Sequence, residues 1–229
     1  MMHEWFLASP IVLASLAAVA ALIVDALTPH SERVTYGFSI VSLILVLVAA
    51  AGTVPFNGTA FGTMIRGGGV AAVFDLIFAL GGVLTIVASR PYIAARNFEH
   101  DEFYTLVLYA TAGMMLIAHA QNLLITFIGI EVMSLSFYVL AGYFRQTLHS
   151  VESALKYFLL GAFATGFLAF GIALVYGATG SIEFGAIATA INKDALNFPR
   201  LLPIGIALVI VGLGFKVAVF PFHQWAPDV

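Results

Sequence analysis

The chain has 229 residues, of which 62% are hydrophobic and only 9% are charged, and its mean hydropathy is +1.04. A soluble domain of this size needs a charged surface that this composition does not supply, so an ordinary soluble protein is excluded. The net charge of −3 gives no basic surface for nucleic acid, and the lack of cysteine excludes disulfides, thiolate metal sites and iron–sulfur ligation by this chain.

Apolar runs of membrane-spanning length predict an all-α polytopic membrane protein. About 20 apolar residues cross a bilayer as a helix. The sequence holds about seven such runs, near 6–27, 35–54, 71–90, 103–120, 122–144, 152–177 and 201–222. The first run does not fit a cleavable signal peptide, because the residues before it include no Lys or Arg and its apolar core is too long.

Polar segments separate the runs and indicate an orientation. Only Gln121 and Asn122 stand between the fourth and fifth runs, which predicts a tight helical hairpin. Pro55-Phe56-Asn57-Gly58 marks another connection, Gly67-Gly68-Gly69 is expected to be a loop, and the longest connection is about 178–200. With the N-terminus outside, the cytoplasmic side holds one basic residue more than the other side: Arg33, Arg90, Arg96 and Arg145 against Arg66, Lys193 and Arg200. The positive-inside rule therefore favours an external N-terminus.

A carboxylate, Glu131, lies near the centre of the fifth run, in Phe-Ile-Gly-Ile-Glu-Val-Met-Ser. It is about nine residues, or about 14 Å, from the start of the run, and its short side chain cannot reach the interface from there. A charge at bilayer depth costs about 3 kcal/mol on insertion scales, so such residues generally pair, face water or carry ions. We interpret Glu131 as a group that moves charge; the alternative is a protonated acid held by Ser134.

An amine, Lys216, stands inside the seventh run and is followed by Pro221. Proline removes a helical hydrogen bond and tends to break the helix, and Gly212 and Gly214 loosen the preceding turn. Broken helices at membrane depth are typical of ion-coupling sites in transporters. A lysine that pairs with a carboxylate and separates from it changes its proton affinity, which predicts a proton switch; the alternative is snorkelling to the interface.

Three further ionisable residues have less specific settings. Lys156 lies one turn inside the sixth run with Glu152 four residues before it, so an interfacial lysine, an i,i+4 pair and a proton entry point all stay open. His119 is of a residue type that can act as a proton relay, but at the end of its run it is expected to face the hairpin. Asp75 begins the third helix and is interpreted as a structural complement to the helix dipole.

Three segments in this order resemble the antiporter-like membrane subunits of respiratory complex I. They are Gly-Ile-Glu-Val-Met-Ser around Glu131, Ala-Leu-Lys-Tyr-Phe-Leu-Leu-Gly-Ala-Phe around Lys156, and Gly-Phe-Lys-Val-Ala-Val-Phe-Pro-Phe-His-Gln-Trp around Lys216. The resemblance implies that Glu131 and Lys216 form a proton half-channel, that Lys156 modulates this pair, and that the seventh helix breaks near Pro221. His223 and His119 are candidate relays.

The resemblance also implies the setting of the chain. Residues 1–100 would be three leading helices and 101–229 most of the first antiporter-like repeat, so we expect a part of a longer subunit with two inverted repeats. The chain itself would bind no cofactor or metal and hold no catalytic residue; NADH, flavin, iron–sulfur clusters and quinone would belong to partner subunits. The expected location is the bacterial inner membrane, with a periplasmic N-terminus and protons as the transported species.

Two alternatives remain from the sequence. A subunit of a multisubunit sodium/proton antiporter shares the acid and lysine pattern, and sodium dependence would favour it. A non-transporting helical spacer would be favoured if neutral substitutions at Glu131 and Lys216 left coupling intact.

Overall fold

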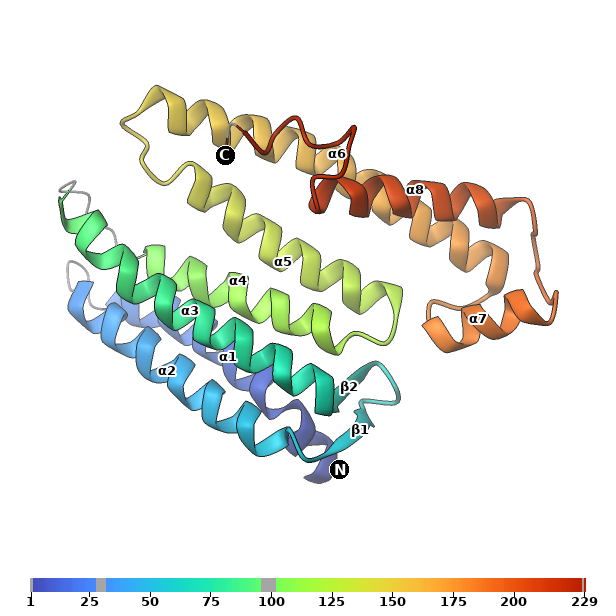
Figure 1. Cartoon of the computed structure of the whole chain (residues 1–229), viewed down its shortest axis with the longest axis horizontal. Coiled ribbons are helices and arrows are strands. Elements are labelled where there is room, and N and C mark those ends of the chain that lie inside the picture. The colour runs from blue at the N-terminus through green and yellow to red at the C-terminus, as the bar shows by residue number, and fades with distance from the viewer. Residues whose placement is uncertain (1, 28–31, 96–101, 228) are drawn as a thin grey trace. The chain divides into compact units, whose positions relative to one another are not determined.

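The structure is a computed structural model and describes residues 2–27, 32–95, 102–227 and 229. The elements in these ranges are α1 (Met2–Leu27), α2 (Glu32–Thr53), β1 (Asn57–Ala60), β2 (Ile65–Gly68), α3 (Gly69–Ala95), α4 (Glu102–His119), α5 (Leu123–Ala141), α6 (Leu148–Thr179), α7 (Phe184–Asn192) and α8 (Leu201–Lys216) (Figure 1). Among the described residues, α1, α2, α3, α5 and α6 are long and apolar enough to cross a membrane, and α8 is a shorter apolar helix. The predicted all-α polytopic class is confirmed. Arg96, used for the orientation, lies outside the described residues.

The chain divides into two compact units. The first comprises Met1–Ala120 and Ile128–Leu140, and the second comprises Gln121–Phe127 and Ala141–Val229. This boundary differs from the predicted division at residue 100, because α4 and most of α5 pack with the leading helices. The predicted division follows the family's repeats rather than packing, and it stays a prediction.

In the first unit, α1 to α4 form a bundle in which α1 packs against α2 and α4, and α3 packs against α2 and α4 (Figure 1). Small side chains on α1 make this contact close: Ala14, Ala18 and Ala21 are each at most 1% exposed. Outside the bundle contacts, α1 presents large apolar side chains such as Leu16 and Ile23, which are 61% and 55% exposed. Apolar outer faces around a small-residue interior are what a helix bundle in lipid requires.

The segment between α2 and α3 is a β-hairpin, so the prediction of a loop at Gly67-Gly68-Gly69 is wrong. β1 and β2 pair antiparallel from Asn57 opposite Gly68 to Ala60 opposite Ile65. Gly68 has φ 76°, and a Cβ there would collide with the carbonyl of Phe56, so the position requires glycine. The two four-residue strands, Asn-Gly-Thr-Ala and Ile-Arg-Gly-Gly, lack the β-branched alternation that would identify them in the sequence.

In the second unit, α6 and α8 lie side by side (Figure 1). Their backbones meet at glycine: a Cβ on Gly171 would lie 2.8 Å from the carbonyl oxygen of Gly205, and one on Gly212 would lie 2.6 Å from Leu168 Cβ. α7, a nine-residue helix with no buried residue, occupies part of the predicted 178–200 connection. α6 ends at Thr179 and is capped by Gly180, which has φ 73° and whose N–H donates to Tyr176 O at 2.7 Å.

The final helix, α8, ends at Lys216, earlier than the predicted limit at residue 222. Ala218 adopts the left-handed conformation, with φ 51°, and Val219 N–H donates to Gly214 O at 2.9 Å. These bonds close the helix before Pro221, which lies in the turns that follow. The lysine therefore occupies the last helical position, and the carbonyls of Gly214 and Phe215 before it accept from Val219 and Ala218 of the following turn.

Candidate functional site

Glu131 lies in the first unit, on the part of α5 that packs against α4. A Cβ on Gly113 of α4 would be 2.6 Å from Met133 N, and a Cβ on Gly129 of α5 would be 2.8 Å from Ile117 Cγ1. The two backbones are therefore in direct contact on either side of Glu131. Glu131 is half-buried, and Ser134, one turn on, is 1% exposed. The acid thus stands on a rigid helix crossing that holds its Cα in place.

Lys156 lies on α6 in the second unit and pairs with Glu152. The distance from Lys156 Nζ to Glu152 Oε1 is 2.8 Å, and the two side chains are 46% and 58% exposed. Tyr157, the next residue, belongs to the buried face of α6, so the lysine lies outside that face. The i,i+4 pair is thus present in the structure, and the interfacial position and the proton entry point stay predictions.

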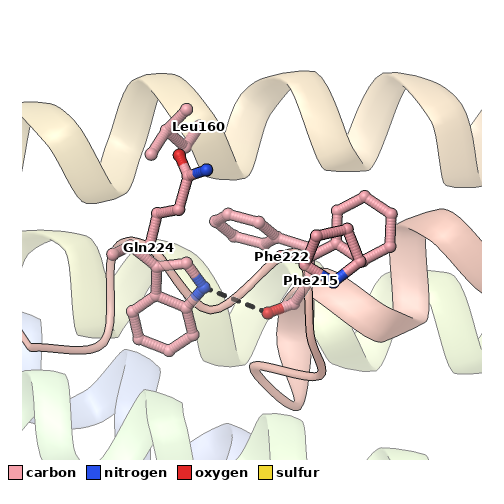
Figure 2. Close-up of a pocket in the computed structure, with 6 residues that line it drawn as sticks. Leu160, Phe215, Phe222 and Gln224 are labelled. Atoms are coloured by element: carbon pink, nitrogen blue, oxygen red, sulfur yellow. Dashed lines mark hydrogen bonds between the residues drawn. The ribbon is translucent and has the colours of Figure 1, made fainter.

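Lys216 is half-buried at the end of α8, where the chain turns back towards α6. The Trp225 indole stacks on the Tyr157 ring with 4.5 Å between centroids and 16° between planes. Its Nε1–H donates to the carbonyl of Phe215 at 3.1 Å, as the dashed line in Figure 2 shows. The turn after α8 is thereby tied to α6 at Tyr157 and to α8 at Phe215, the residue before Lys216.

A pocket of about 250 Å³ opens beside this turn (Figure 2). Aromatic and apolar groups dominate its lining, which consists of Leu160, Phe215, Pro221, Phe222, Gln224 and Trp225. The predicted break residue Pro221 is thus part of the pocket wall. His223 is exposed, with its ring 5.6 Å from that of Phe220.

His119 and Asp75 form a buried pair in the first unit, which corrects the prediction for both. His119 Nε2 lies 2.8 Å from Asp75 Oδ2, and both side chains are 0% exposed. The histidine does not face the hairpin, and Asp75 is too far along a helix that begins at Gly69 to complement its first N–H groups. Sequence periodicity carries no information on which residues of two helices meet, so no sequence pattern predicts this pair.

The predicted site residues fall in both units: Glu131 and His119 in the first, and Lys156, Lys216, Pro221 and His223 in the second. The pairing of Glu131 with Lys216 therefore stays a prediction. Within the described ranges there is no group of three His, Asp or Glu side chains that could hold a metal ion.

Comparisons with known proteins decide the family. Residues 120–229 match the model described as NADH:quinone oxidoreductase/Mrp antiporter, transmembrane. NADH-quinone oxidoreductase subunit N 1 of Chloroherpeton thalassium is 40% identical over 233 residues, which covers 100% of this chain and 48% of that protein. The chain belongs to the antiporter-like membrane-subunit family.

Another relative and two solved structures are also similar to the chain. Subunit N of Salinibacter ruber is 46% identical over 171 residues, covering 75% of this chain and 34% of that protein. A chain of respiratory complex I from Thermus thermophilus superposes with a TM-score of 0.79 at 36% identity, over 96% of this chain and 46% of that one. A chain of the Mrp complex from Dietzia sp., at 24% identity and a TM-score of 0.78, shares the fold. The chain spans about half the length of the curated relatives it matches.

Proposed function

We propose that this chain is part of the membrane subunit N of an NADH:quinone oxidoreductase, a proton-pumping translocase whose electron transfer takes place in other subunits. The observation that carries the proposal is the match to subunit N over the whole of this chain at 40% identity. The chemistry agrees with it, because an acid and two lysines stand on apolar helices of a chain with few charges.

In this proposal Glu131 and Lys216 are the titrating pair. Glu131 is held at the α4–α5 crossing, and Lys216 stands at the C-terminal end of α8. Such helix ends supply the dipoles and polar groups that ions use at membrane depth. When the acid and the amine approach, each stabilises the charged form of the other, and when they separate a proton can leave.

Lys156 would act as the modulating charge, because Glu152 at 2.8 Å already competes for its ammonium. Strengthening or weakening that pair changes the field along α6 without moving the backbone. His223 and His119 are the proposed relays, and Pro221 marks the turn after α8.

The partners and location follow from the same proposal. Partners would be the other membrane subunits of the oxidoreductase, the lipid bilayer and translocated protons. NADH, flavin, iron–sulfur clusters and quinone would be bound by those partners. The chain would lie in the bacterial inner membrane with its N-terminus on the periplasmic side.

Co-purification tests the assignment. The full-length gene with an affinity tag is expressed in its host, and the purified assembly is assayed for NADH:quinone oxidoreduction. Co-purified activity, inhibited together with proton uptake by a quinone-site inhibitor, supports the proposal. An assembly without that activity contradicts it.

The family model also covers Mrp antiporters, which makes a sodium/proton antiporter subunit the second candidate. Charge movement by the purified assembly in vesicles without sodium separates the two. The oxidoreductase subunit moves protons in sodium-free medium when NADH is supplied, whereas the antiporter subunit requires sodium and no NADH.

A further inference from the structure

The buried pair Asp75–His119 has two polar atoms that are left without partners. Asp75 Oδ2 and His119 Nε2 share a hydrogen bond of 2.8 Å, a length typical of charge-assisted bonds. Asp75 Oδ1 and His119 Nδ1 are both inaccessible and have no hydrogen-bond partner among the described residues. Each side chain thus hydrogen-bonds the other through one polar atom, and its second polar atom is left without a hydrogen-bond partner among the described residues.

No protonation state of the pair removes this need for partners. A neutral imidazole carries a donor on one nitrogen and an acceptor on the other, and an imidazolium carries two donors, so Nδ1 requires a partner in every case. An ionised carboxylate accepts on both oxygens. Because buried polar groups in folded proteins are almost always hydrogen-bonded, to water where protein groups are absent, both atoms indicate internal water.

The pair lies close to the end of the bundle. His119 is the last residue of α4, and Ala120 forms an isolated bridge with Ile65 of β2. Asp75 is about 9 Å along α3 from Gly69, at 1.5 Å per residue. The end of α4 that carries His119 is therefore joined to the hairpin of β1 and β2 through Ala120.

The geometry points to Asp75 and His119 as a hydrated proton-binding site in the first unit, with water on Asp75 Oδ1 and His119 Nδ1. With the carboxyl ionised and the imidazole neutral, the pair carries one negative charge. One proton taken from water neutralises the pair, either as imidazolium with carboxylate or as imidazole with carboxylic acid, and its return to water restores the negative charge. A buried net charge is costly, so the pair holds this proton until a change in the local field releases it. The role in pumping rests on the proposed function.

The elements that pack against α3 and α4 carry other charged groups. Among the described residues these include Arg66 on β2, which is exposed and donates from Nε to Asn57 Oδ1 at 3.0 Å, Glu4 on α1 and Glu131 on α5. Arg90 of α3 is in the last turns of its helix, with its guanidinium 4.3 Å from the centroid of the Tyr36 ring. Of these groups, Glu131 stands on the helix that packs directly against α4, and we assign the field change at the pair to its protonation.

The test uses the double variant Asp75→Asn/His119→Gln in the full-length gene and the assembled complex. The two amides can keep a hydrogen bond across the α3–α4 contact but cannot bind a proton. We expect assembly to persist and proton translocation per NADH oxidised to fall below wild type. Thr105→Val is the matched control, because it removes a buried, unpartnered hydroxyl from the same helix without removing a titratable group. Wild-type pumping by the assembled double variant would overturn the inference.

If the double variant does not assemble, the density map of the wild-type complex decides. Ordered water at both Oδ1 and Nδ1 supports the site, and protein atoms packed on either one in place of water overturn it. Failure of the proposed function is distinguished by the pumping of the Glu131→Gln variant. If Glu131→Gln also leaves pumping unchanged, the proton-path assignment fails, whereas loss of pumping in Glu131→Gln alone defeats only the Asp75–His119 site.

Discussion

Trp225 stacks on Tyr157, with 4.5 Å between ring centroids, and so ties the chain after α8 to α6. Trp225→Ala removes both this stack and the bond to the Phe215 carbonyl, whereas Trp225→Phe removes only the bond. We expect the alanine variant to lose about 1 kcal/mol for the aromatic pair and a similar amount for the bond, about 1 kcal/mol. The thermal midpoint of the purified complex should therefore fall for both variants and fall further for alanine. An alanine variant with the wild-type midpoint would show that this turn does not hold the end of α8.

The α4–α5 crossing beside Glu131 depends on glycine. In Gly113→Val the new side chain would begin 2.6 Å from Met133 N, so the helices must separate. Overpacking of this kind typically costs about 1–3 kcal/mol, and we expect less assembled complex and impaired pumping. The yield of assembled complex on a native gel measures this effect.

Gly81→Ala in α3 is the matched control for that substitution. A Cβ at Gly81 would meet nothing within 4 Å, and alanine is favoured over glycine in helices by about 1 kcal/mol. The control should assemble at least as well as wild type. Equal losses in both variants would mean that the crossing has no special need for a small residue.

Variants of the Lys156–Glu152 pair separate the effect of the positive charge on pumping from the effect of its position on α6. Exposed i,i+4 pairs contribute only about 0.3–0.5 kcal/mol, so neither Glu152→Gln nor the swap Glu152→Lys/Lys156→Glu should impair assembly. The swap keeps an ion pair but moves the positive charge by one turn. If the lysine acts from position 156, we expect the swap variant to pump fewer protons than wild type. Recovery of wild-type pumping in the swap would show that an ion pair in either direction suffices.

The sequence predicted the helices well because lipid imposes a strong pattern on them. The run 6–27 corresponds to α1 at Met2–Leu27, and the Gln121-Asn122 hairpin lies between α4 and α5 as expected. Asn122 supports that hairpin with its side-chain oxygen, which accepts from Ile125 N at 2.8 Å. Continuous apolar runs and the polar segments between them are local signals, so they can be recognised without knowledge of how the helices pack.

Features that depend on contact between distant segments were not predictable. Asp75 and His119 are 44 residues apart, and only the packing of α3 on α4 brings them together. The end of α8 was misplaced because Ala218 takes a left-handed conformation that its residue type does not indicate. The resemblance to the family supplied roles for Glu131, Lys156 and Lys216 that no local pattern contains, and these roles stay predictions.

The most direct test of the central claim is NADH-driven proton translocation in inverted membrane vesicles that contain the full-length subunit with Glu131→Gln. Glu183→Gln, an exposed acid before α7, is the matched control, and Lys216→Ala with Lys193→Ala as its control repeats the comparison for the amine. We predict that assembled complexes with Glu131→Gln or Lys216→Ala lose proton translocation while both controls retain it. Wild-type translocation by assembled Glu131→Gln complex would contradict the assignment of this acid to the proton path.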